Sequence, residues 1–278
     1  MKNKKLSLAV LIAAVIAAAC LILGFLMPGG QTQPQPTAQP TAEVTPAPTD
    51  APEETPAATP EATPLPSEEP PLDLDSLPGF LNGGTDVCGI PLPLAIPNTS
   101  LVIEGIGQYS GPFVEDGSGE PMANVMALVV KNDSRKFTEF AEITLAVDGK
   151  DPAVFQISGL PGKEYVLVME KNRRPFDRSE LLGYETHLFA ERDDVSLQAD
   201  KLKIYAADGA LTAQNLTGET LDAVYIRYKS KLVPRCYLGG ITYSCKLEAL
   251  AAGTEKTAQT GHYSDAYSQI VMVETVKN

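Results

Sequence analysis

Residues 28–73 limit where this chain can build a hydrophobic core. They contain 13 of the chain's 23 prolines and eight carboxylates, with no Lys or Arg among them. Such a segment has too little apolar surface to offset the entropy of ordering, and proline removes backbone donors, so we expect it to be disordered and extended. We interpret it as a spacer that carries a folded part through a cell wall; a linker without a specific purpose is the alternative.

An apolar run at residues 6–27 precedes this tract and follows Lys2, Lys4 and Lys5. A helix of about 20 residues crosses the hydrocarbon core of a bilayer, so the run is long enough to span one. By the positive-inside rule the three lysines stay in the cytoplasm. The sequence therefore predicts a cytoplasmic stub at 1–5, a transmembrane signal-anchor helix at 6–27, and a single-pass membrane protein whose C-terminal part is extracytoplasmic.

Two other fates of the apolar run stay open. Its alanines at 17–19 could supply the small-residue cleavage site of a secretory signal peptide. The sequence Ala-Ala-Ala-Cys that ends at Cys20 also resembles a bacterial lipoprotein box, in which the cysteine is lipidated. Apolar residues continue beyond Cys20 to Met27, so we favour the uncleaved anchor. Each alternative still leaves the rest of the chain tethered or exported outside the membrane.

Net charge excludes one class of partner. The chain has 22 basic and 35 acidic residues, a formal net charge of −13, and the part after the three N-terminal lysines has 19 against 35, or −16. Such a field repels nucleic acid and anionic lipid headgroups. We therefore expect no nucleic-acid partner, and the one membrane contact we predict is the N-terminal helix.

After residue 73 the sequence changes to short apolar runs separated by Gly, Pro, Asn and Asp. Ile143, Leu145 and Val147 alternate with more polar neighbours, as in a strand with one buried face. This pattern is typical of a β-sandwich. The expected strands are 101–106, 125–131, 143–147, 153–157, 165–169, 203–206, 221–228, 241–247 and 269–273. Residues 178–192 could form a helix, but we interpret them as a connector.

An internal repeat suggests two modules. Asn132-Asp133-Ser134 is followed by a strand and later by Leu160-Pro161-Gly162, and Asn215-Leu216-Thr217 is followed by a strand and later by Leu250-Ala251-Ala252-Gly253. Asn and Ser or Thr side chains can bond their own backbone and form a turn. We predict a β-sandwich module at 74–175, a connector at 176–194, and a second, immunoglobulin-like module at 195–278.

The stretch from Asn215 to Lys229, a polar turn followed by Tyr225-Ile226-Arg227-Tyr228-Lys229, resembles part of FxLYD-type immunoglobulin-like domains. The Phe-x-Leu-Tyr-Asp motif itself is replaced by residues 225–229. The order of basic start, apolar helix, Pro/Thr/Glu stalk and β modules is similar to that of Gram-positive bacterial surface proteins. These resemblances imply extracytoplasmic modules without catalytic residues.

Few residues offer acid–base or metal chemistry. His187 and His262 are the only histidines and are far apart in sequence. The chain has no Gly-x-Ser-x-Gly elbow, no dinucleotide fingerprint and no Walker motif. The acidic stretch 115–120 lacks the spacing of a calcium loop and is better interpreted as a hairpin turn. We expect no catalytic residue, no metal and no cofactor.

Cys88, Cys236 and Cys245 follow the predicted anchor, and an odd number cannot pair completely. Cys236 and Cys245 bracket Gly239-Gly240, which we interpret as the tip of a hairpin. A two-residue loop would place Cys236 opposite Tyr243, so a disulfide would need a longer loop or a bulge. We favour free thiols over a Cys236–Cys245 bond.

Tyrosines concentrate near the C-terminus. A tyrosine packs its ring and leaves its hydroxyl wet, which suits a protein interface or a glycan, although strands also favour tyrosine. The candidate binding residues are Tyr237, Tyr243, His262, Tyr263 and Tyr267. We expect a non-catalytic protein that presents a binding or structural surface at a bacterial cell envelope to an unknown protein or glycan. The alternative is a cell-surface glycan or cell-wall hydrolase, or its accessory carbohydrate-binding protein.

Overall fold

The structure is a computed structural model that describes residues 70–193, 195–207 and 209–277. The predicted cytoplasmic stub, the anchor helix with Cys20, and residues 28–69 of the predicted stalk lie outside these ranges. Within them, no helix has both the length and the apolar character needed to cross a bilayer. The described part of the chain is mostly β, which confirms the predicted fold class at that level.

Sixteen strands and two short 3-10 helices, η1 (Leu74–Ser76) and η2 (Arg178–Glu180), form the regular structure of the described ranges. The strands are β1 (Phe80–Asn82), β2 (Asp86–Val87), β3 (Ile90–Pro91), β4 (Leu94–Ala95), β5 (Leu101–Phe113), β6 (Glu120–Asn132), β7 (Phe137–Val147), β8 (Ala153–Leu160), β9 (Tyr165–Met169), β10 (Leu181–Arg192), β11 (Leu202–Ala207), β12 (Ala210–Asn215), β13 (Leu221–Val233), β14 (Cys236–Leu250), β15 (Glu255–Gln259) and β16 (Ser268–Val276). Every strand expected from the sequence lies within one of them.

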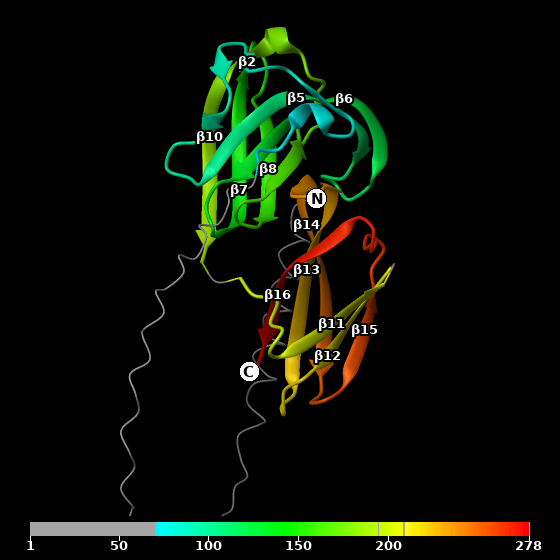
Figure 1. Cartoon of the computed structure of the whole chain (residues 1–278). Helices are drawn as coiled ribbons and strands as arrows, with labels where there is room; N and C mark the ends of the chain where they lie inside the picture. Colours follow the sequence, from blue (N-terminus) through cyan, green and yellow to red (C-terminus); the bar gives the residue numbers. More distant parts are fainter. Residues whose placement is uncertain (1–69, 194, 208, 278) are drawn as a thin grey trace, which may run out of the picture. The chain divides into compact units, whose positions relative to one another are not determined.

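Strands β5 to β10 and strands β11 to β16 follow the same pairing plan (Figure 1). In the first set, β6 pairs with β5 and β9, and β7 pairs with β10 and β8. In the second set, β12 pairs with β11 and β15, and β13 pairs with β16 and β14. All of these pairings are antiparallel. We call residues 101–192 the first repeat and residues 202–276 the second repeat.

Asn132 fixes the turn between β6 and β7. Its side chain is fully buried, and its Nδ2 donates to the carbonyl oxygens of Lys136 at 2.8 Å and Leu160 at 3.2 Å. Its Oδ1 accepts from the backbone N–H of Ser134 at 3.1 Å and from the Ser134 hydroxyl at 2.9 Å. Because every polar atom of the amide is bonded, the side chain can be buried while it ties the turn to the end of β8.

Asn215 makes the equivalent bonds in the second repeat. Its Nδ2 donates to the carbonyl oxygens of Glu219 at 2.7 Å and Leu250 at 3.0 Å. Its Oδ1 accepts from the N–H and the hydroxyl of Thr217 at 2.9 and 2.7 Å. The repeated Asn-x-Ser/Thr turn that the sequence predicts is therefore confirmed in its hydrogen bonds. The module boundaries and the immunoglobulin-like assignment stay predictions.

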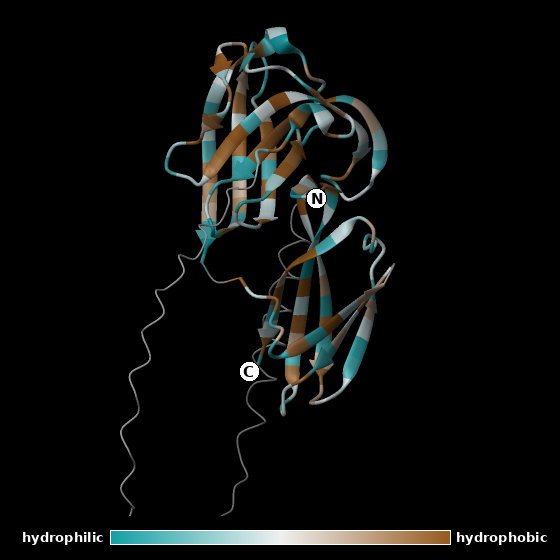
Figure 2. Cartoon of the chain, viewed as in Figure 1, coloured by the Kyte–Doolittle hydropathy of each residue, from teal (hydrophilic) through white to brown (hydrophobic). Residues whose placement is uncertain are grey.

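Alternating side chains explain why each repeat forms a layered core. In β7, Ile143, Leu145 and Val147 are buried while the residues between them are partly exposed. Figure 2 shows the same alternation of apolar and polar residues on strands of both repeats. Burying each such side chain contributes about 1.5–3 kcal/mol, so the buried faces of the strands stabilise both repeats.

Residues 181–192, which we interpreted as part of a connector, form strand β10 and pair with β7. The sequence pattern is weak there because β10 is an edge strand whose side chains are largely half-exposed; Leu188, for example, is 60% exposed. Only the three residues of η2 are helical in this stretch. Edge strands need no strongly apolar face, so periodicity alone did not reveal it.

The predicted hairpin between Cys236 and Cys245 is wrong, because β14 runs through both residues without a turn. Gly239 and Gly240 serve a close approach instead. A Cβ on Gly240 would overlap the carbonyl oxygen of Gln156 in β8, and one on Gly239 would overlap the side chain of Val114. Glycine inside a strand often marks such an approach of another backbone.

The β13–β14 hairpin extends past its own repeat. Past the paired residues Tyr228 and Tyr243, β13 runs on to Val233 and β14 begins at Cys236. The equivalent hairpin of the first repeat is shorter, because β7 ends at Val147 and β8 begins at Ala153. In this extension, residues 236–238 pair in parallel with residues 165–167 of β9. An eight-stranded sheet therefore passes from the first repeat into the second, in the order β1-β5-β6-β9-β14-β13-β16 with β4 also paired to β5.

Candidate functional site

Four aromatic side chains of the second repeat pack together, and we call them the aromatic cluster: Tyr228, Tyr243, His262 and Tyr263. Tyr228 and Tyr243 stand opposite each other on β13 and β14, with ring centroids 5.5 Å apart. Tyr263 meets Tyr228 edge-on at 5.2 Å, and His262 stacks on Tyr243 at 4.7 Å. Solvent exposure therefore increases across the cluster, from the buried Tyr228 and Tyr263 to the exposed His262.

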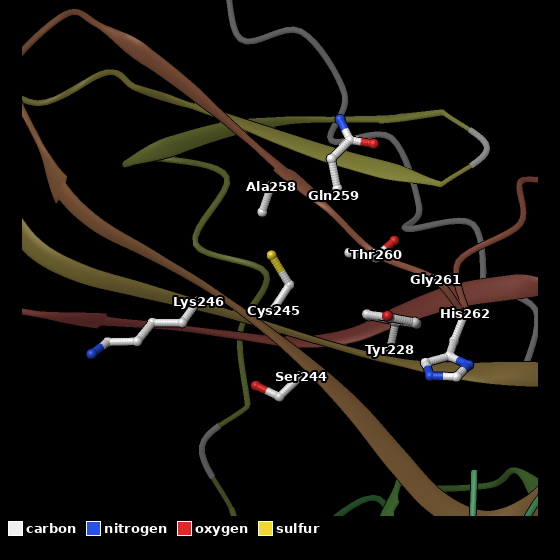
Figure 3. Close-up of a pocket in the computed structure, with 9 residues that line it drawn as sticks. All are labelled: Tyr228, Ser244, Cys245, Lys246, Ala258, Gln259, Thr260, Gly261 and His262. Atoms are coloured by element: carbon white, nitrogen blue, oxygen red, sulfur yellow. The ribbon is translucent and has the colours of Figure 1, made fainter. Parts of the chain in front are cut away.

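An open pocket of about 320 Å³ lies beside the cluster, between β14 and β15 (Figure 3). Its lining residues are Tyr228, Ser244, Cys245, Lys246, Ala258, Gln259, Thr260, Gly261 and His262. The lining combines an aromatic wall with hydroxyl, amide, imidazole and ammonium groups. It contains no carboxylate, so this pocket does not supply the two carboxyl groups of a glycosidase.

Burial keeps two tyrosine hydroxyls and one thiol of this region in their neutral forms. It raises the pKa of the Tyr228 and Tyr243 hydroxyls, which therefore stay protonated at neutral pH. Burial also raises the pKa of the Cys245 thiol. Because the thiolate is the reactive form of cysteine, Cys245 is poorly suited to act as a nucleophile. The pocket thus offers an aromatic surface together with hydrogen-bonding groups.

The structure brings together three of the five predicted binding residues: Tyr243, His262 and Tyr263. Tyr237 lies elsewhere, 1% exposed in the core of the first repeat. Tyr267 is 67% exposed and makes no ring contact with the cluster. Tyr228, which is not among the predicted binding residues, forms the buried base of the cluster.

The cysteines within the described ranges, Cys88, Cys236 and Cys245, are free. Cys236 stands opposite Val233 and Cys245 opposite Ile226, nine positions apart on one continuous strand. At about 3.3 Å per residue that separation is far beyond the ~7 Å limit between Cα atoms in a disulfide. The structure therefore excludes the Cys236–Cys245 bond, and Cys20 lies outside the described residues.

Sequence reasoning missed a pair of inward-facing charges, Glu115 and Lys229. Glu115, in the turn after β5, accepts hydrogen bonds from the N–H groups of Met169 and Gly240 at 2.8 and 2.9 Å. The sequence of this stretch indicated a hairpin turn but gave no sign that Glu115 points inward. The Gly239-Gly240 pair was the one available signal, since it marks where the turn and β14 meet, but we read it as a hairpin tip.

Lys229 follows the cluster residue Tyr228 on β13, and its side chain is fully buried. Its Nζ donates to the carbonyl oxygens of Ser158 at 2.9 Å, Gly240 at 3.0 Å and Ile241 at 2.7 Å. Three acceptors match the three donors of an ammonium group. Ser158 belongs to the first repeat and the others to β14, so this one side chain fastens the two repeats together.

Burial shifts the pKa values of both groups toward neutrality. It raises the pKa of Glu115 to about 7, although the hydrogen bonds from Met169 and Gly240 and the charge of Lys229 lower it. Burial lowers the pKa of Lys229 to about 7, against the opposing effect of Glu115. The charge at the contact between the repeats is therefore sensitive to pH in the neutral range.

The remaining polar candidates do not form a site. Within the described ranges, no three His, Cys, Asp or Glu residues are placed to hold a metal ion. His187 stacks on Tyr184 in β10, away from His262. Residues 114–119 make the turn between β5 and β6, closed by hydrogen bonds from Gly117 and Gly119, as we predicted from the sequence.

Comparisons of the chain with protein-family models, with curated proteins and with solved structures found no match. The resemblance of residues 215–229 to FxLYD-type domains stays a prediction.

Proposed function

We propose that this chain is a single-pass membrane protein that presents a non-catalytic binding surface at a bacterial cell envelope. The N-terminal helix anchors it, the Pro/Thr/Glu tract is a spacer, and two immunoglobulin-like β-sandwiches form the extracytoplasmic part. The placement rests on the order of basic residues, apolar run and stalk in the sequence. The partner is a protein or a glycan.

The aromatic cluster is the observation that carries the binding part of the proposal. Its base is buried and held by ring contacts, so Tyr243 and His262 reach the surface already oriented. A preformed aromatic surface loses little entropy when a partner binds, and interface hot spots are enriched in such anchors. The adjoining pocket adds the polar groups of Ser244, Lys246 and Gln259 for hydrogen bonding.

The non-catalytic part is supported by the chemistry of the same residues. The pocket has a thiol whose pKa is raised, a lysine that pairs with Glu248, and no carboxylate in its lining. Nucleophilic catalysis needs an activated nucleophile beside an oriented base, whereas His262 stacks on Tyr243 and the lining holds no carboxylate to orient it. These groups instead suit recognition by stacking and hydrogen bonding.

Two measurements test the proposal. Protease added to intact protoplasts should remove the β part from membrane-associated chain, and full-length chain in the medium would contradict the anchor. In parallel, immobilised chain is exposed to envelope fractions and glycan arrays. His262→Ala should reduce whatever specific retention the wild-type chain shows, whereas Tyr267→Ala, an exposed aromatic outside the cluster, should not. Equal loss in both variants would reject the cluster as the contact surface.

A further inference from the structure

The two repeats differ at one corresponding edge. In the first repeat, the space beside β8 and β9 is filled by the extension of β14, which pairs in parallel with β9. The side chain of Tyr237 enters the core there, and Gly240 lies against the backbone of Gln156 in β8. In the second repeat, the corresponding strands are β14 and β15. Among the described strands β15 pairs with β12 alone, and the pocket opens between β14 and β15 (Figure 3).

The strand register shows why the second repeat has a pocket at this place. Ile143 follows Asn132 by eleven residues, as Ile226 follows Asn215, so the two isoleucines are equivalent. Phe155 stands opposite Ile143, and Cys245 stands opposite Ile226. A small thiol therefore replaces a phenyl ring at the edge of the second repeat.

Strand β15, which faces β14 across the pocket, also carries a smaller side chain than its equivalent β9. Leu128 and Leu211 each precede their buried Asn by four residues. Val168 stands opposite Leu128, and Ala258 stands opposite Leu211. Cys245 and Ala258 both line the pocket. Two large-to-small replacements have thus opened the space that Phe155, Val168 and the incoming Tyr237 close in the first repeat.

We propose that the gap between β14 and β15 is a docking site for an extended segment of a partner polypeptide. The segment pairs in parallel with β15 and places one aromatic side chain in the pocket, as β14 does with β9 and Tyr237. Adding a strand to an open edge obtains affinity from backbone hydrogen bonds and specificity from the pocket that takes a side chain. This inference rests on the proposed binding function and names the kind of partner.

The polar residues of the edge strand β15 indicate that the partner binds reversibly. β9 is apolar and fully buried, because its own chain covers it permanently. β15 has the sequence Glu-Lys-Thr-Ala-Gln and is largely exposed. Charged residues on a free edge keep it soluble and prevent uncontrolled pairing. The matching segment is therefore an aromatic residue within a polar or small-residue strand, bound reversibly.

A peptide taken from the chain itself is a direct probe. It has the sequence of residues 234–242 with serine in place of Cys236, because this strand fills the equivalent site in the first repeat. We titrate it into the full chain in detergent. We expect saturable binding, new protection of the amides at 255–259 from hydrogen exchange, and binding weakened roughly tenfold or more when the peptide carries Tyr237→Ala. Protection confined to β9 would overturn the assignment.

Variants of the protein give the matched test. Cys245→Phe with Ala258→Val installs the residues of the first repeat, fills the pocket and should abolish peptide binding while thermal stability is kept. Ala258→Val alone fills less of the pocket, so it should weaken peptide binding relative to the wild type but not abolish it. Leu216→Ser, at an exposed position in the Asn215 turn, should bind as the wild type does. Undiminished binding to a folded, filled pocket overturns the inference.

Two further outcomes separate this inference from the proposed function. If no peptide binds but envelope retention still depends on His262, the strand site is wrong and the binding function stands. If a neutral oligosaccharide binds instead of the peptide and competes at the pocket, the site belongs to a glycan and the strand site is again rejected.

Discussion

Glu115 of the first repeat and Lys229 of the second are joined through Gly240. The N–H of Gly240 donates to the Glu115 carboxylate at 2.9 Å, and its carbonyl oxygen accepts from Nζ of Lys229 at 3.0 Å. Opposite charges are thus connected by one residue of β14 that has no side chain. The contact between the repeats depends on this arrangement as well as on the pairing of β9 with β14.

We expect Lys229→Met to destabilise the chain by about 3 kcal/mol or more, because removing one member of an enclosed charge pair leaves the other uncompensated. Three carbonyl oxygens also lose their donor. Chemical denaturation measures the change, and Lys201→Met, at an exposed lysine, is the control. The double variant Glu115→Gln, Lys229→Met should recover part of the loss; a double variant as unstable as the sum of both single ones would argue against coupling.

The same pair should give a minimum in the pH dependence of stability. The pKa of Glu115 is raised from 4.5 to about 7, so its contribution is present at low pH and falls as pH rises through that window. The pKa of Lys229 is lowered from 10.5 to about 7, so its contribution is present at high pH and falls as pH decreases toward 7. On each side of the minimum, the free energy of unfolding changes by up to ~1.4 kcal/mol per pH unit.

The measurement is the free energy of unfolding from pH 5 to pH 9, for the wild type and for the Glu115→Gln, Lys229→Met variant. The difference between the two curves should be least favourable to the wild type near pH 7. If the difference in unfolding free energy between the two proteins is constant from pH 5 to pH 9, then neither Glu115 nor Lys229 changes its protonation in the folded chain over that range.

Gly240→Ala should cost roughly 1–3 kcal/mol or more, because the added methyl group must displace the backbone of β8. Gly218→Ala is the matched control, since a Cβ there meets nothing within 4 Å, and it should stay within about 0.5 kcal/mol of the wild type. Thermal unfolding of both variants checks this. Equal stability of the two would mean that β14 does not press on β8 at this point.

Asn132→Ala and Asn215→Ala should destabilise the chain by similar amounts, each about 2 kcal/mol or more, because each removes the partners of several enclosed backbone groups. Gln269→Ala, at an exposed position in β16, is the control. Urea denaturation distinguishes the cases. A large cost at one asparagine and none at the other would show that the two turns are equivalent in geometry but not in energy.

Local features of the fold were predictable from the sequence, because they are encoded within a few residues. The Asn-x-Ser/Thr turns bond their own backbone, and β7 alternates apolar and polar residues, so both were visible without the structure. Tyr243, His262 and Tyr263 were also predicted as a group, since they lie within one strand and the turn that follows β15.

Contacts between distant segments were not predictable in this way. Tyr237 was grouped with the binding residues because it is near them in sequence, but it belongs to the extension that pairs with β9. Lys229 gives no local sign that it is buried, since its partners on Ser158 and Gly240 are supplied by other strands. Gly239-Gly240 was misread because glycine permits both tight turns and close backbone approach.

The parallel pairing of β9 with β14 has a consequence for the synthesis of the chain. It joins residues that are about 70 positions apart, and contacts of such long sequence separation form late because the loop between them must first close. Because synthesis proceeds from the N-terminus, β9 is made first, and its apolar edge stays exposed until residues 236–238 have been synthesised and can pair with it. During that interval the first repeat is a nascent domain with an exposed aggregation-prone strand, and it reaches its final form only once the second repeat has been delivered.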